Sequence, residues 1–141
     1  MLKVVVDTNV LVSALLKPDS VPELVLSLVL SGEIVLCLSE PIAIEYEEVL
    51  KRPKFKKLDR GKVKELLSRL RSEAHWVDPK IRLLVTRADP EDNKFLECAL
   101  EAKADFLITG NTKHFPTKKF QETVILNPAQ FLAVAASLLD L

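Results

Sequence analysis

Short apolar runs rich in β-branched residues alternate along this chain with segments of helical periodicity. Strands joined by helices pair in parallel, because a crossover of that length returns the chain to the same end of the sheet. Such a sheet is covered by helices on both faces. The sequence therefore predicts one α/β domain over residues 1–141, a three-layer, Rossmann-like fold with a central parallel sheet of about four to five strands. The expected strands are 2–6, 34–38, 75–77, 105–109 and 123–126, and the expected helices are 9–17, 22–30, 40–51, 61–73, 90–102 and 128–140.

The predicted helix starts are marked by residues that favour the N-cap position. A serine, aspartate or asparagine there can accept a hydrogen bond from a free backbone N–H of the first turn. Proline in the first turn supports several of the same boundaries, since its missing N–H costs nothing there. The predicted caps are Ser20, Ser39, Asp59, Asp89 and Asn127.

Composition excludes some classes of protein. No apolar run reaches the roughly 18–20 residues of a membrane span, and the first residues lack the layout of a signal peptide. We therefore expect a cytoplasmic protein without a membrane segment, and Cys37 and Cys98, in apolar runs, as buried thiols rather than a disulfide. The formal net charge of zero argues against a domain whose whole surface binds nucleic acid, although 51–62 and 112–119 are locally basic.

Several acids stand where the predicted fold would gather them. The first apolar run stops on Asp7, and ligands of parallel α/β sheets bind outside the carboxyl ends of the strands. Each acid also has an ordinary explanation. Asp7 could cap the next helix, Glu45 could lie on a solvated flank, and Asp92 could complete a capping box. Asp105 could be a loop residue, and Asn111 could serve a turn.

Convergence of these acids at one sheet edge would require them to take up protons or bind a cation. Two carboxylates about 4 Å apart repel by roughly 4 kcal/mol at an effective dielectric constant near 20. Oxygen ligands select hard ions, so Mg²⁺ or Mn²⁺ is expected rather than Zn²⁺. Water on such an ion can become the nucleophile that attacks a phosphodiester. The pattern therefore favours metal-assisted hydrolysis of a phosphate ester.

Three separated stretches resemble the ordered motifs of PIN domains. They read VVVDTNVLVSALL, SEPIAIEYEEVLKRPKF and DPEDNKFLECALEAKADFLITGN, and the resemblance extends from residue 3 to about 128. PIN domains are metal-dependent ribonucleases, and many are toxins of VapC-type toxin–antitoxin pairs. The resemblance implies that Asp7, Glu45 and Asp92 are metal ligands. Where the family has a Thr-x-Asp pattern, this chain has Thr109 and then Asn111, an amide in place of the carboxylate.

The predicted function is a metal-dependent endoribonuclease acting on single-stranded or structured RNA. Asp7, Glu45 and Asp92 would hold the ion, Thr109 or Asn111 would orient a water or the phosphate, and Asp105 is a further candidate. The resemblance also implies a small antitoxin as partner and self-association as a homodimer or higher homo-oligomer. The apolar last helix could offer a dimer surface, although such a helix is more often simply part of the core. The candidates for contacts with RNA phosphates are Lys51, Arg52, Lys54 and Lys113, with His114 near them.

Two other functions remain as alternatives. A catalytically weak or inactive PIN-like module that binds RNA or a protein partner is favoured by Asn111. A receiver or aspartyl phosphatase would also place an aspartate after the first strand. The phosphatase needs a second aspartate where Asn9 stands, and the receiver needs acids where Val5 and Val6 stand, so both are disfavoured.

Overall fold

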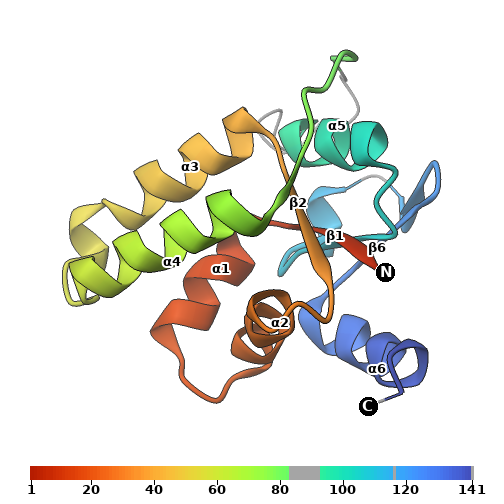
Figure 1. Ribbon diagram of the computed structural model, residues 1–141. Helices are drawn as coiled ribbons and strands as arrows, with labels where there is room; N and C mark the ends of the chain where they lie inside the picture. The colour runs from red at the N-terminus through yellow and green to blue at the C-terminus, as the bar shows by residue number, and fades with distance from the viewer. Residues whose placement is uncertain (83–92, 116, 141) are drawn as a thin grey trace.

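A computed structural model describes residues 1–82, 93–115 and 117–140 of the chain (Figure 1). Strands and helices alternate, as the sequence predicts. The strands are β1 Lys3–Val6, β2 Val35–Leu38, β3 His75–Trp76, β4 Phe106–Ile108, β5 Lys119–Phe120 and β6 Thr123–Leu126. The α-helices are α1 Thr8–Leu16, α2 Val21–Leu30, α3 Glu40–Leu50, α4 Arg60–Glu73, α5 Asn93–Ala102 and α6 Pro128–Leu138, and short 3-10 helices span Pro53–Phe55 and Thr112–His114.

The strands form one sheet in the order β3-β2-β1-β4-β6-β5. All neighbouring strands are parallel except β5, which pairs with β6 in antiparallel register. The expectation of about four to five strands was one too low, because β5 has no apolar run to reveal it. It is a two-residue edge strand, and the hydrogen bond from Ile125 N to Lys118 O, 2.8 Å, holds it against β6.

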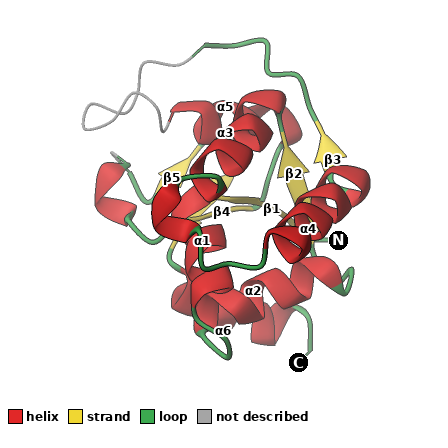
Figure 2. Cartoon of the chain, turned by 90° about the vertical axis from the view of Figure 1, so that its left-hand side faces the viewer, coloured by secondary structure: helices red, strands yellow, loops and turns green. Residues whose placement is uncertain are grey.

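Helices cover both faces of the sheet, which confirms the predicted α/β fold. Helix α5 lies on one face, and α1, α2 and α6 lie on the other (Figure 1). Figure 2 shows the strands enclosed by these helices. Val4, Val5, Leu107 and Ile108 of the central strands are fully buried. Phe131 of α6 meets Phe106 edge to face, with ring centroids 5.5 Å apart.

Most of the predicted caps are confirmed by side-chain hydrogen bonds. Ser20 accepts from Glu23 N, Asp59 from Lys62 N, and Asn127 forms a full capping box with Gln130. Ser39 precedes α3 as predicted, yet its side chain makes no capping bond with the described residues. Ser39 is buried, at 1% exposure, and its side chain lies beside the thiol of Cys98 instead. Asp89 lies outside the described residues.

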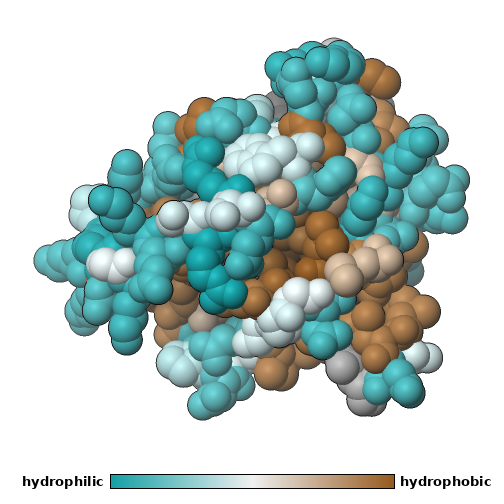
Figure 3. All heavy atoms as spheres, viewed as in Figure 1, coloured by the Kyte–Doolittle hydropathy of each residue, from teal (hydrophilic) through white to brown (hydrophobic). Residues whose placement is uncertain are grey.

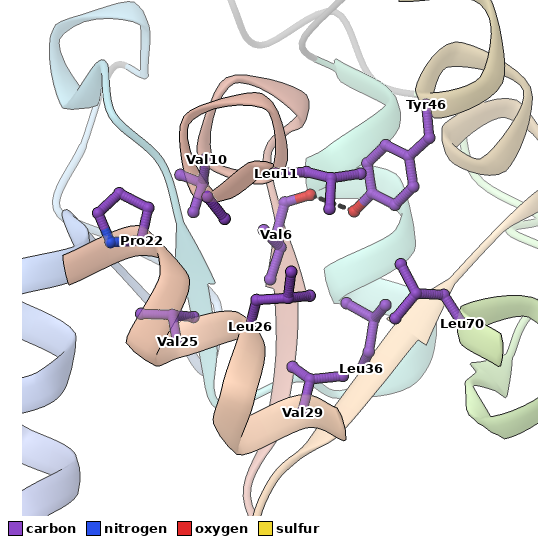
Figure 4. A pocket seen from close by; sticks show the side chains of 11 residues that line it. Val6, Val10, Leu11, Pro22, Val25, Leu26, Val29, Leu36, Tyr46 and Leu70 are labelled. Carbon is purple, nitrogen blue, oxygen red and sulfur yellow. Dashed lines mark hydrogen bonds between the residues drawn. The ribbon is translucent and has the colours of Figure 1, made fainter. Parts of the chain in front are cut away.

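The interior between α1, α2 and the sheet is closely packed. Figure 4 shows apolar side chains around a gap of about 10 Å³, far below the size of a ligand site. Cys37 and Cys98 are buried free thiols, as predicted. Among the described residues, no helix has the length and apolar character needed to cross a membrane.

Candidate active site

Asp7 lies at the carboxyl edge of the sheet, between the two central strands. Its backbone N–H donates to Ile108 O at the end of β4, 2.9 Å away, and its carbonyl accepts from Val10 N in the first turn of α1. Asp7 is thus both the N-cap residue of α1 and the first residue after β1. Its side chain is 7% exposed. A carboxylate this deeply buried needs compensating partners.

Thr109 is the partner that fixes the Asp7 carboxylate. Thr109 follows β4 directly and is fully buried. Its hydroxyl donates to Asp7 Oδ2 at 2.8 Å and accepts from Asn111 N at 3.1 Å. Because both capacities of the hydroxyl are in use, its rotation is fixed. The ends of β1 and β4 are therefore joined by a side-chain bond as well as by the sheet.

Asn9 connects Asp7 to the loop after β4. Its Nδ2 lies 3.4 Å from Asp7 Oδ2, and its Oδ1 accepts from Gly110 N at 3.0 Å. A Cβ on Gly110 would lie 3.3 Å from Asn9 Oδ1, closer than most real Cβ contacts. The absence of a side chain at position 110 thus lets this loop approach Asn9 closely.

Helix α3 brings Glu45 to the same edge. The hydroxyl of Tyr46 donates to Val6 O, which ties α3 to the last residue of β1 (Figure 4). Its neighbour Glu45 accepts a hydrogen bond from Thr8 Oγ1 through Oε2 and forms an ion pair with Lys94 of α5 through Oε1, 2.7 Å from Nζ. The side chains of Glu45 and Lys94 are 22% and 17% exposed. Three elements, β1, α3 and α5, therefore meet around the two carboxylates.

Burial raises the pKa of Asp7, and the negative charge of Glu45 raises it further, while the hydrogen bond from Thr109 acts in the opposite direction. The hydrogen bonds that the described side chains give Asp7 come from neutral groups, Thr109 and Asn9. The positive charge of Lys94 is directed at Glu45. The Asp7 carboxylate is accordingly destabilised in a way that a nearby cation would relieve.

The structure unites only some of the predicted site residues. Asp7, Glu45 and Thr109 come together, and Asn111 lies beside them, with its Nδ2 2.7 Å from His114 Nε2. Asp105 lies instead at the amino end of β4, where its carboxylate accepts from Lys3 N at 2.9 Å. Asp92 lies outside the described residues. Within 1–82, 93–115 and 117–140, no group of three or more His, Cys, Asp or Glu residues is arranged to hold a metal.

Sequence reasoning missed three residues that shape this site: Thr8, Tyr46 and Lys94. Tyr46 is buried, and its hydroxyl bond to β1 has no sequence signal. Lys94 did carry a signal. It is the one basic residue in 88–102, a segment that otherwise holds only acids among its charged residues. A lone lysine among acids near a predicted acidic centre is a natural ion-pair candidate.

Comparison with known proteins identifies the family. The family model of the PIN domain matches residues 3–113. This chain belongs to the PIN domain family. It is also 35% identical over 112 residues to an uncharacterized protein of Methanocaldococcus jannaschii, a match that covers 78% of this chain and 71% of that protein. The predicted resemblance to PIN domains is thereby confirmed.

A solved structure supports the fold. The crystal structure of VapBC2 from Rickettsia felis, bound to a DNA fragment from their promoter, is similar with a TM-score of 0.57. The two chains are 17% identical, and the match covers 89% of this chain and 98% of the other. PIN domains are generally nucleases, and they typically bind divalent metal ions.

Proposed function

We propose that this protein is a Mg²⁺- or Mn²⁺-dependent endoribonuclease whose centre is formed by Asp7, Glu45 and Asp92. One observation carries the proposal. Asp7 is a buried carboxylate at the carboxyl edge of a parallel sheet, close enough to Glu45 for the two charges to repel. Because the chain belongs to a family that generally consists of nucleases, we expect these two carboxylates to bind a metal ion for phosphodiester hydrolysis.

The donor set suits a hard divalent cation. Asp7 and Glu45 offer carboxylate oxygens, the ligands that Mg²⁺ and Mn²⁺ prefer, and Asp92 would add a third. When bound, such an ion lowers the pKa of a coordinated water and offsets negative charge on the scissile phosphate. The thiols of Cys37 and Cys98, which would favour a softer metal, are buried in the core.

The neighbouring residues position these ligands. Thr109 fixes the orientation of the Asp7 carboxylate, and Thr8 and Lys94 hold that of Glu45. Because the Thr109 hydroxyl is engaged twice, we assign it a positioning role and give the task of orienting a water or phosphate to Asn111. The Asn111 amide stands next to this network through its backbone bond to Thr109.

We also propose a protein partner and self-association. The structurally similar Rickettsia felis protein is named as VapBC2 and was solved with a DNA fragment from their promoter. By analogy, this chain would act as the toxin of a toxin–antitoxin pair and associate with a small antitoxin and with further copies of itself. Co-purification of the chain with the product of an adjacent reading frame would test the partner directly.

Cleavage of a labelled single-stranded RNA tests the enzymatic proposal. The wild type is incubated with Mg²⁺, Mn²⁺ or EDTA and compared with Asp7→Asn and Glu45→Gln. Asp105→Asn is the matched control, since it makes the same chemical change at the opposite edge of the same sheet. We expect metal-dependent cutting that falls on the order of 10³-fold or more in Asp7→Asn, equivalent to about 4 kcal/mol, and persists in Asp105→Asn. Equal cutting in EDTA, or by Asp7→Asn, would contradict the proposal.

A second function is favoured by one specific residue. Asn111 replaces a carboxylate of the family pattern, which favours a PIN-like module that binds RNA or a protein without cutting it. Folded wild type that binds RNA but cuts none with either metal would support this function. Asn111→Asp would then be expected to introduce metal-dependent cutting, because it restores the missing acid.

A further inference from the structure

The connection between α3 and α4 carries a dense cluster of positive charge. We call its eight basic residues the basic tip: Lys51, Arg52, Lys54, Lys56, Lys57, Arg60, Lys62 and Lys64. All of them are exposed. They make up eight of the chain's 20 lysines and arginines, and residues 51–64 contain a single acid, Asp59. A chain with zero net charge thus concentrates positive charge at one place.

The basic tip combines a high density of positive charge with the lack of an internal counterion among the described residues. Within the part of the chain that the structure describes, none of its eight residues forms a salt bridge, whereas Arg71, Lys80 and Lys94 elsewhere all do. The one acid within 51–64, Asp59, uses its carboxylate to cap α4. Clustered like charges repel one another, and a polyanion would relieve that repulsion.

The basic tip is built on a firmly held backbone. Phe55 at its centre is 7% exposed, and Lys54 lies over its ring with Nζ 5.1 Å from the centroid. Successive backbone bonds, including Phe55 N to Arg52 O at 2.9 Å, close the turns of the connection. The guanidinium of Arg60 also donates to Leu50 O, which joins the two helices. The charges are therefore presented from a fixed scaffold.

The basic tip begins where α3, the helix that carries Glu45, ends. Lys51 follows Glu45 by six residues, about 9 Å along the helix axis. Helices α3 and α4 extend together beyond the end of β1 that carries Asp7 (Figure 1), and the surface over this end is hydrophilic (Figure 3). A groove of about 550 Å³ between the two helices is lined by Lys51, Arg60 and Lys64 among others. A strand leaving the acidic centre along α3 would reach these charges.

We propose that the basic tip is a metal-independent anchor for the phosphate backbone of the RNA substrate, separate from the acidic centre. The inference rests on the proposed function for the identity of the polyanion. A membrane surface is a poorer fit, because Phe55, the one aromatic residue of the segment, is buried and cannot insert among lipids. The anchor would hold the strand while the acidic centre acts on it.

Counterion release gives the expected size of the effect. Each phosphate contact of a single strand contributes about 0.7 to the slope of log affinity against log salt concentration. At 0.1 M salt, that corresponds to roughly fivefold in affinity for each contact. Removing two contacts should therefore weaken binding about 25-fold and reduce the slope by about 1.4.

Fluorescence anisotropy with a labelled single-stranded RNA in EDTA tests the anchor without any cleavage. The test variant is Lys54→Gln/Lys57→Gln. The matched control, Lys80→Gln/Lys103→Gln, removes the same charge from exposed positions away from the basic tip. For the test variant we expect binding to weaken about 25-fold and the salt slope to fall by about 1.4. For the control we expect binding to weaken less than about twofold. Circular dichroism melts verify that both variants are folded.

Equal salt slopes and affinities for the test variant and the wild type would overturn the anchor. So would a wild type that binds no RNA in EDTA but binds polyglutamate through the basic tip, since that would indicate an acidic protein as partner. Failure of the anchor differs from failure of the proposed function. RNA binding through the basic tip without cutting by any metal refutes only the nuclease. Metal-dependent cutting with unchanged kcat/KM in the test variant refutes only the anchor.

Discussion

Helix α3 carries Glu45 of the acidic centre and ends at Lys51, where the basic tip begins, but the two regions are built in opposite ways. At the centre, Asp7 and Glu45 are buried or half-buried, and each accepts bonds from specific neighbours. At the basic tip, the charged side chains are exposed and, among the described residues, have no ionic partner. The properties of the acidic centre depend on the exact positions of its side-chain atoms. Those of the basic tip depend on its total positive charge.

This difference sets what each region should do when it is changed. A substitution at the centre should have a large effect that depends on pH and metal. A substitution at the basic tip should have a graded effect that depends on salt. The predictions below test the properties of the centre on which this contrast depends, beginning with the largest expected effect.

Thr109→Val removes the hydrogen bond that holds Asp7 while keeping the shape of the side chain. A hydrogen bond to a charged group contributes about 1.5–3 kcal/mol, so we expect a loss of roughly 10- to 100-fold in kcat/KM. The bond from Thr109 lowers the pKa of Asp7. Its removal raises that pKa further, so the acidic limb of the pH–rate profile should move to higher pH.

The control for this variant is Thr123→Val. Thr123 is also buried, and its hydroxyl donates to Ala104 O at 2.7 Å, near the amino end of β4. It should lose a similar amount of stability and leave the pH–rate profile in place. A Thr109→Val enzyme with an unshifted profile would show that Asp7 is not positioned in the way described.

Asp7→Asn should stabilise the metal-free protein near neutral pH. Because burial raises the pKa of Asp7, the folded chain binds a proton more tightly than the unfolded chain does. That contribution to stability is present below the unfolded pKa of 3.8 and is lost as the pH rises through the folded pKa. The neutral amide avoids the loss, so we expect a gain of about 1 kcal/mol, or roughly 3 °C in Tm, at pH 7 in EDTA.

The pH series completes this test. The advantage of Asp7→Asn should shrink below about pH 4, where the wild-type carboxyl group is protonated in both states. Asp105→Asn, an aspartate whose pairing is with the Lys3 backbone at the other edge, should show no such gain. A lower Tm for Asp7→Asn at pH 7 would mean that the charge is well solvated and that the contrast with the basic tip is weaker than described.

The smallest expected effect concerns the interior behind the centre. Burial raises the pKa of Cys37 to about 11 and that of Cys98 to about 12. At pH 8, both groups are therefore protonated and shielded, and a disulfide reagent such as DTNB should not react within the time in which it labels the unfolded chain. Rapid labelling of the folded protein would show that water reaches the layer beneath α5.

Much of this fold was readable from the sequence because its signals are local. Apolar runs located the long strands, and Asp59 and Asn127 marked helix starts. Strand β5 was missed because two residues on a sheet edge form by pairing with β6 rather than by their own pattern. Ser39 precedes α3 as expected but makes no capping bond with the described residues, because a cap residue's side-chain contacts depend on tertiary packing.

The candidate site was predicted in outline only. The place of Asp7 followed from the rule that ligands bind at the carboxyl ends of parallel strands. The bond between Tyr46 and Val6, the ion pair of Lys94 and the separation of Asp105 from Asp7 all join residues far apart in the chain. No periodicity encodes such contacts, because they depend on how the helices dock on the sheet.

The buried bond between the Tyr46 hydroxyl and the Val6 carbonyl has a consequence for how this protein can evolve. It fixes α3 to the sheet beside Glu45, so the remainder of the helix and the connection beyond it can change in composition while the geometry of the acidic centre stays the same. Gain or loss of lysines at the basic tip would therefore change the affinity for the proposed RNA substrate without moving the proposed metal ligands. The residues of the basic tip should accordingly vary more among members of the family than Glu45 and Tyr46 do.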